Sequence, residues 1–136
     1  MLAKEYLQQI KRQEFIVRTL NDEVEEIIAK LGIKAYSYND EPPSQGGNPK
    51  RMEYLIYKKI ELQDEMDQET RRLCEMRKET IERLNTLPEV KESEVLYKRY
   101  LKYQSWERIA RDMNYSIRQV QRIHGEALVH LTTLID

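Results

Sequence analysis

Apolar residues recur along the first part of the chain at steps that alternate between four and three positions. The positions that share this spacing are Tyr6, Ile10, Gln13, Val17, Leu20, Val24, Ile27 and Leu31, and only Gln13 interrupts the apolar series. Steps of this kind place side chains on one stripe of a helix, as in the seam of a coiled coil or a long helical hairpin. Gly32 follows directly, and because glycine is a common stop signal we expect the helix to end there.

A stretch rich in turn-forming residues separates this pattern from the next one. It runs from Ala35 to Lys50 and contains the sequence NDEPPSQGGNP, which can bury almost no apolar surface. We therefore expect an exposed and mobile loop near 35–50. Pro49 suits the first turn of the following helix, and Asn48 is a candidate cap for it.

A second long apolar pattern runs from about Met52 to Leu87. The residues that occupy two positions of its seven-residue repeat are Met52, Leu55, Leu62, Met66, Leu73, Met76 and Leu87. The repeat is interrupted at Lys59, Glu69, Thr80 and Arg83, while the stripe is broadened by Ile56, Ile60, Ile81 and Leu84. Because the apolar seam is imperfect, it favours packing of this helix against another helix of the fold over an isolated two-stranded leucine zipper. Pro88 then ends or bends this helix.

Shorter helical patterns follow Pro88. Their inward positions are Val95, Leu96, Tyr100 and Tyr103, then Trp106, Ile109, Ala110 and Met113, then Val120, Ile123, Ala127, Leu128, Leu131 and Leu134. Ser105 and Ser116 are helix-start signals on either side of the tight connection 113–115. The sequence thus predicts an all-α fold, with a long, coiled-coil-like helical hairpin over 1–88 and a helix-turn-helix bundle over 89–136.

The second helix of this predicted helix-turn-helix has a polar face opposite Val120. That face carries Arg118 and Arg122, which are flanked by Gln119 and Gln121, and the helix starts at Ser116. An arginine can bond guanine O6 and N7 with both arms of its guanidinium, and a glutamine can pair with an adenine edge. Because Ser116 and Gln119 have the spacing of a capping box, Gln119 either closes the helix end or reads bases.

The charge is unevenly distributed along the chain. The 136 residues carry a net charge of -1, so the protein is not a generally basic nucleic-acid binder. Between Lys98 and His124, however, the sequence contains seven basic and only two acidic residues, which gives a local charge of +5. A phosphate-facing surface needs charge of that sign in one place. The candidates for phosphate contacts are Arg108, Arg111 and Lys102, although each alone also fits a solvated helix face.

The residue groups that an enzyme or a metal site needs are missing. His124 and His130 are six positions apart and point in different directions on a helix, and no ligand at the right spacing joins either of them. We therefore expect neither catalysis nor a cofactor. Cys74 is the only cysteine, and no apolar run is long enough to span a bilayer, so we expect a cytoplasmic protein without membrane contact.

The last third of the chain carries a set of residues with a known arrangement. They are Glu94-Val95-Leu96, Arg99-Tyr100, Trp106-Glu107-Arg108-Ile109-Ala110, Ser116, Val120, Ile123 and Ala127-Leu128. From about Val90 to Leu134 the chain resembles region 4 of the sigma-70 family. Within that group, SWERIARDMNYSIRQVQRIH is similar to the phage-encoded ArpU/RinA-type transcriptional regulators of Gram-positive hosts, which also place a helical segment before the helix-turn-helix.

This resemblance implies a phage or prophage activator that binds double-stranded DNA in the bacterial host cell. By position, the DNA-reading residues of the family fall on Arg118, Gln119, Gln121 and Arg122. Ile117 stands where the sigma pattern often has a basic residue, so promoter specificity is not implied. Nothing in the chain resembles sigma region 2, so it should not replace a full sigma factor.

Three classes of function stay open at this point. The first is a sequence-specific regulator whose hairpin forms a homo-oligomer, with a dimer favoured, or meets RNA polymerase. The second is a DNA-packaging component of the terminase small-subunit kind, and the third is a helical protein–protein adaptor. A ring-sized assembly would favour the second class, and the +5 segment argues against the third.

Overall fold

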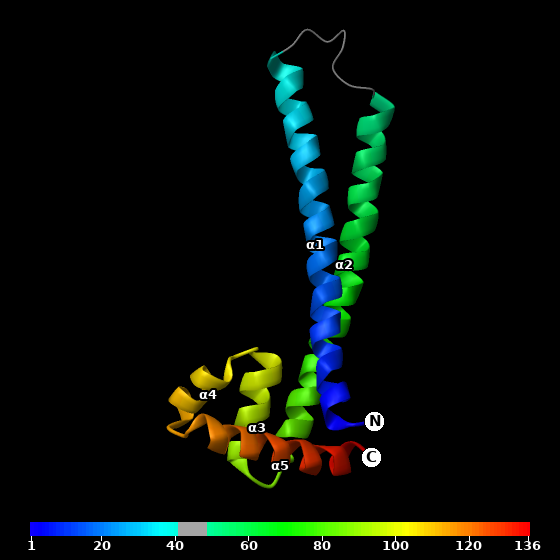
Figure 1. The fold of residues 1–136 in the computed structure, drawn as a ribbon. Coiled ribbons are helices and arrows are strands. Elements are labelled where there is room, and N and C mark those ends of the chain that lie inside the picture. Colours follow the sequence, from blue (N-terminus) through cyan, green and yellow to red (C-terminus); the bar gives the residue numbers. More distant parts are fainter. Residues whose placement is uncertain (41–48) are drawn as a thin grey trace. The chain divides into compact units, whose positions relative to one another are not determined.

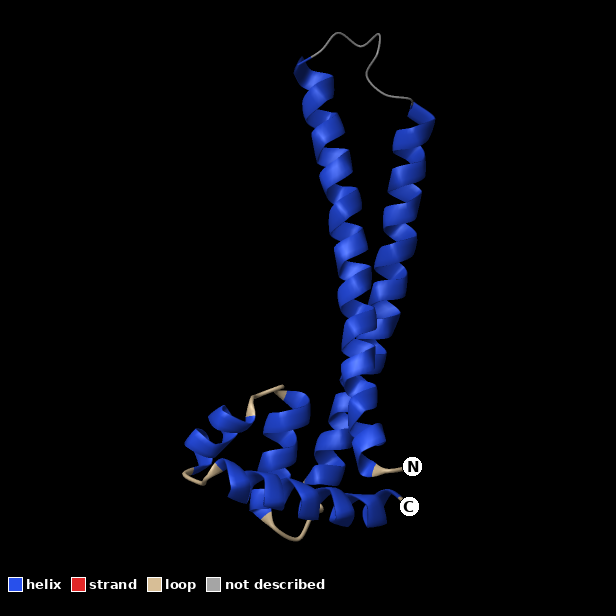
Figure 2. Cartoon of the chain, in the orientation of Figure 1, coloured by secondary structure: helices blue, strands red, loops and turns tan. Residues whose placement is uncertain are grey.

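The computed structural model describes residues 1–40 and 49–136, with side chains over 1–32 and 49–136, and this part of the chain contains helices and loops but no strand (Figures 1 and 2). The elements are α1 (Ala3–Asp40), α2 (Pro49–Leu84), α3 (Val90–Leu96), the π-helix η1 (Tyr97–Leu101), α4 (Trp106–Met113) and α5 (Ile117–Ile135). The predicted all-α fold is confirmed. A search of the described helices for a bilayer-spanning segment finds none with the necessary length and apolar character.

The chain divides into two compact units. Unit 1 combines residues 1–14 with 72–136, and unit 2 consists of residues 15–71. This division differs from the one expected at residue 88, because the start of α1 and the end of α2 share a core with the C-terminal helices. Within unit 1, Figure 1 shows these two helix ends beside α3 and α5.

Unit 1 contains two apolar clusters. The larger joins α1, α2, α3, η1 and α5 and consists of Ala3, Leu7, Ile10, Leu84, Leu87, Leu96, Leu101, Ala127 and Leu131. The smaller lies under α4 and the first turns of α5 and consists of Val95, Ile109, Ala110, Val120 and Ile123, with Trp106 and Met113 packed against it. Burial of these side chains is the main source of the unit's stability, at about 1.5–3 kcal/mol for each large one.

Polar side chains hold the helix ends of unit 1 together. Arg77 donates from Nη1 to Glu14 Oε1 at 3.0 Å and to the carbonyl oxygen of Leu101, the last residue of η1, at 3.3 Å. Thr80, which only interrupts the apolar repeat in sequence, is buried and donates to the Tyr6 hydroxyl at 3.3 Å. Buried polar groups that find partners in this way fix the register of the two helices.

Unit 2 has a thinner core. Among its described side chains, the buried apolar ones are Val24, Ile27 and Leu55, and half-buried residues such as Leu20 and Leu62 continue the stripe. Every position of the predicted series from Tyr6 to Leu31 is buried or half-buried, so the predicted stripe of α1 is confirmed. The expectation that Ile56 and Ile60 would broaden the buried stripe of α2 is wrong, because they are 45% and 57% exposed.

Two expected boundaries of the first helix are also wrong. Gly32 does not end the helix, because α1 continues to Asp40. One glycine inside a helix costs only about 1 kcal/mol, which the rest of a 38-residue helix overcomes. The loop expected near 35–50 is wrong for residues 35–40, which belong to α1, and for residues 49–50, since α2 begins at Pro49, as its prolyl ring predicted. The remainder of that loop, with the candidate cap Asn48, lies outside the described residues.

Candidate nucleic-acid interface

The connection between α4 and α5 is a tight turn built on one left-handed residue. Asn114 has φ 59° and ψ 40°, and asparagine tolerates this conformation better than most other side chains. The Tyr115 amide closes the turn by donating to the Ala110 carbonyl at 3.0 Å. Ser105 caps the start of α4, where its Oγ accepts from the Arg108 amide at 3.2 Å. The predicted helix start at Ser105 and the predicted tight connection are confirmed.

The first turn of α5 is closed by a capping box. The backbone N–H of Gln119 donates to Ser116 Oγ at 3.1 Å, and the backbone N–H of Ser116 donates to the side-chain oxygen Oε1 of Gln119 at 2.9 Å. Of the two roles expected for Gln119, the structure therefore shows the closing of the helix end. The side chain is exposed, and among the described residues its Nε2 group has no hydrogen-bond partner.

Helix α5 has two chemically different faces near its start. Val120 and Ile123 are 0% and 2% exposed and pack in the smaller cluster of unit 1. Arg118, Gln121 and Arg122 are exposed, and Arg118 and Arg122 line one shallow concavity with Ser116 and Gln119. Among the side chains that the structure describes, no carboxylate lies within ion-pair distance of either arginine. The predicted arrangement, with Val120 inward and the guanidinium groups outward, is confirmed.

The other basic residues of the +5 segment differ in how far they are neutralised. Lys98 Nζ lies 3.6 Å from a Glu94 oxygen and 3.8 Å from an Asp112 oxygen, so its charge is largely compensated. Arg108 Nε reaches the same Asp112 carboxylate only at 4.0 Å. Arg111 and Lys102 are exposed, but the concavity of α5 includes neither of them. The structure thus brings four of the eight expected site residues together in this concavity, namely Ser116, Arg118, Gln119 and Arg122. The other four lie elsewhere on the surface of unit 1 and are Gln121, Arg108, Arg111 and Lys102.

The side chains of Tyr100, Trp106 and His124 form an aromatic group between η1, α4 and α5, and helical spacing alone does not predict that they meet. The Arg99 guanidinium lies 4.1 Å from the centre of the Trp106 ring and donates to the Gln104 carbonyl at 3.0 Å. The Tyr100 hydroxyl and His124 Nε2 are 2.8 Å apart, and the imidazole meets the indole edge-on. Burial, assisted by the positive charge of Arg99, lowers the pKa of His124 to about 4, so this imidazole is neutral at pH 7.

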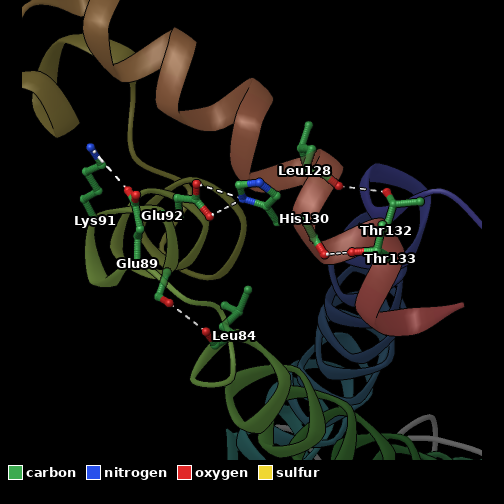
Figure 3. Close-up of polar contacts among 9 residues, drawn as sticks. Leu84, Glu89, Lys91, Glu92, Leu128, His130, Thr132 and Thr133 are labelled. Carbon is green, nitrogen blue, oxygen red and sulfur yellow. Dashed lines mark hydrogen bonds and ion pairs between the residues drawn. The ribbon is translucent and has the colours of Figure 1, made fainter.

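A second histidine ties α5 to α3. His130 Nδ1 lies 2.8 Å and 2.9 Å from the two carboxylate oxygens of Glu92, which is 1% exposed (Figure 3). The hydrogen bond to this carboxylate, followed by its negative charge, raises the pKa of His130 above 6.5. This hydrogen bond fixes the C-terminal part of α5 to α3. The helix that presents the two exposed arginines is therefore held both by its buried apolar face and by its C-terminal part.

Comparisons with protein-family models, with curated proteins and with solved structures find no match for this chain. What the protein binds is therefore inferred from the charge, the exposure and the placement of its own residues.

Proposed function

We propose that the protein is a sequence-specific regulator of transcription that binds double-stranded DNA, encoded by a phage or prophage and activating phage genes. In this proposal the start of α5 enters the major groove, and Arg118, Gln121 and Arg122 face the base edges. One observation carries the proposal. Two arginines that have no ion-pair partner among the described side chains lie on the outward face of a helix whose inward face is fully buried.

The surroundings of these arginines agree with an anionic partner. The first turn of α5 contains no acidic residue, and its free amide groups add a partial positive charge at the helix N-terminus. Arg108 and Arg111, from α4, are exposed and available for backbone phosphates. Such phosphate contacts would make the affinity fall steeply as the salt concentration rises.

The exposed apolar residues of unit 2 support a second part of the proposal, namely that two copies associate. Tyr54, Ile56, Tyr57 and Ile60 lie within two turns of α2 and are each between 45% and 65% exposed. A concentration of apolar side chains of this kind is typical of a surface that another chain covers. Two copies reading two half-sites would bind more tightly than one small module. RNA polymerase is the other occupant expected for this surface.

The test is a footprint on DNA recovered from a random-sequence pool with the full-length protein. Arg122→Ala should abolish the footprint and leave the helical circular dichroism unchanged, because the arginine side chain is exposed. Arg51→Ala, an exposed arginine in unit 2, is the matched control and should bind normally. An unchanged footprint for Arg122→Ala would contradict the role of α5.

Solution mass, measured on the same samples, distinguishes the remaining classes. A dimer agrees with the regulator, whereas a ring-sized assembly would favour a DNA-packaging component. If the pool selection yields no bound DNA at any salt concentration, the protein is better explained as a protein–protein adaptor.

A further inference from the structure

Unit 1 contains a second basic site, distinct from the concavity on α5. It is a cavity of about 330 Å³ between the start of α1 and the aromatic group around His124. Its cations are Lys4, Lys11 and Arg99, and its walls include Trp106 and His124. All of its lining residues belong to unit 1. The volume is at the lower end of the range for small-ligand sites.

The charge of this cavity is of one sign. No acidic residue lines it, and within residues 1–32 and 49–136 no carboxylate lies at ion-pair distance from Lys4, Lys11 or Arg99. Lys4 and Lys11 are exposed and reach the cavity from one face of α1, where they are seven positions apart. Three converging cations without a counter-charge form a site for a multiply charged anion.

The walls of the cavity add hydrogen-bonding groups and apolar edges. Arg99 uses one N–H for the Gln104 carbonyl, so most of the five N–H donors of its guanidinium are left for a ligand. The stacking of that guanidinium on Trp106 fixes its plane. The aromatic side chains, Tyr103 among them, offer ring edges to an apolar group on the ligand.

We propose that this cavity binds a small phosphate monoester, with Lys4, Lys11 and Arg99 holding the phosphate and the aromatic wall contacting the rest of the ligand. A dianionic phosphate matches three cations better than a single carboxylate does. Lysine acts on phosphate as a point charge, whereas arginine adds directed donors. This inference does not depend on DNA binding by α5, since the two sites share no residue.

The chain contains its own reporter for this site, because Trp106 is its only tryptophan. We expect saturable changes in Trp106 fluorescence on titration with inorganic phosphate and with phenyl phosphate, and none with phenol. The double variant Lys4→Gln/Lys11→Gln should weaken phosphate binding roughly tenfold, the product of two partly solvated charge contacts. Lys58→Gln/Lys78→Gln, which removes two exposed lysines of α2, is the matched control and should bind as tightly as the parent.

The pKa values of His124 and His130, measured by nuclear magnetic resonance with and without phosphate, provide a second test of binding at this cavity. Bound phosphate should raise the pKa of His124 from its value of about 4, since a nearby anion stabilises the imidazolium, and should leave His130, outside the cavity, unchanged. The proposal is overturned by the lack of a saturable response or by equal weakening in both double variants. A response to duplex DNA without any response to either small phosphate would also overturn it.

Discussion

Units 1 and 2 are built from the same two long helices but bury their side chains to different degrees. In unit 1 the helix ends are covered by three more helices, and side chains such as Leu7, Leu96 and Leu131 are fully buried. In the part of unit 2 whose side chains are described, the buried apolar residues are Val24, Ile27 and Leu55, while several isoleucines and tyrosines stay exposed. A layer of two helices can bury only one narrow stripe on each helix. The comparison indicates that unit 1 buries its large apolar side chains within itself, whereas the described part of unit 2 leaves apolar side chains exposed that the proposed second copy would cover.

The largest expected effect breaks the core of unit 1. Leu131→Ala removes a side chain that is 0% exposed and should lower the free energy of unfolding by about 2–5 kcal/mol. Leu62→Ala, a half-buried position of unit 2, should cost about 1 kcal/mol, because much of its surface is already in water. Urea denaturation at one fixed protein concentration measures both values. Equal losses would show that the two units are packed alike.

The next effect concerns the exposed apolar residues of unit 2. Ile56→Lys/Ile60→Lys should raise the dissociation constant of the dimer at least about tenfold, since two charges would have to be buried at the contact. Helicity should persist, because both residues are exposed in the single chain. Analytical ultracentrifugation measures the constant, with the exposed Gln68→Lys on the same helix as control. A parent protein that stays monomeric at every concentration would refute the dimer.

A smaller effect is expected from the helix starts of unit 1. Ser116→Ala removes one half of the capping box and should cost about 1 kcal/mol of the free energy of unfolding. Thr19→Ala in unit 2 should be close to neutral, because the Thr19 hydroxyl only donates to the carbonyl of Ile16 in the same helix. Thermal unfolding followed by circular dichroism compares the two variants. A loss for Thr19→Ala as large as that for Ser116→Ala would contradict the special role of the cap.

A dependence of stability on pH is also expected to arise in unit 1. The folded-state pKa of His130 lies above 6.5, so the stability that it contributes is complete below pH 6.5 and is lost as the pH rises through that folded-state pKa. The folded-state pKa of His124 is about 4, so its contribution is present above pH 6.5 and is lost as the pH falls toward 4. Stability should therefore be greatest near pH 6.5.

Two variants separate these contributions. His130→Gln should remove the decline above pH 6.5, and His124→Gln should remove the decline below it, when the free energy of unfolding is measured across the range. If His130→Gln retains the alkaline decline, the bond between His130 and Glu92 does not produce it. An acidic decline that survives in His124→Gln would likewise trace to other groups, such as the carboxylates.

The periodic features of the fold were accessible from the sequence. The stripe from Tyr6 to Leu31, the helix starts at Ser105 and Ser116 and the inward position of Val120 all follow from side-chain spacing and capping chemistry. The extent of α1 could not be predicted from the sequence, because the cost of one glycine at Gly32 is small beside the helix propensity of the other residues of α1. The exposure of Ile56 was also missed, since spacing cannot tell how many helices will cover a stripe.

The candidate sites divide in the same way. The outward face of α5 belongs to one helix and could be predicted from a helical wheel. The phosphate cavity could not, because Lys4 and Lys11 are separated from Arg99 by most of the chain and meet it only in the folded unit. The π-helix η1 also depends on a distant segment, because the Arg77 side chain from α2 donates to the carbonyl of its last residue, Leu101. Contacts between distant segments decide such features, and one sequence does not report them.

The capping box at the start of α5 limits what Gln119 could distinguish in the proposed complex. An amide side chain recognises adenine by giving a hydrogen to N7 and taking one from N6, which needs both ends of the amide. Here Oε1 already accepts from both the backbone amide and the hydroxyl of Ser116, and only Nε2 is left over. Gln119 would therefore favour edges rich in acceptors, those of guanine or the O4 of thymine, and an operator selected by this protein should be poor in adenine at that one position.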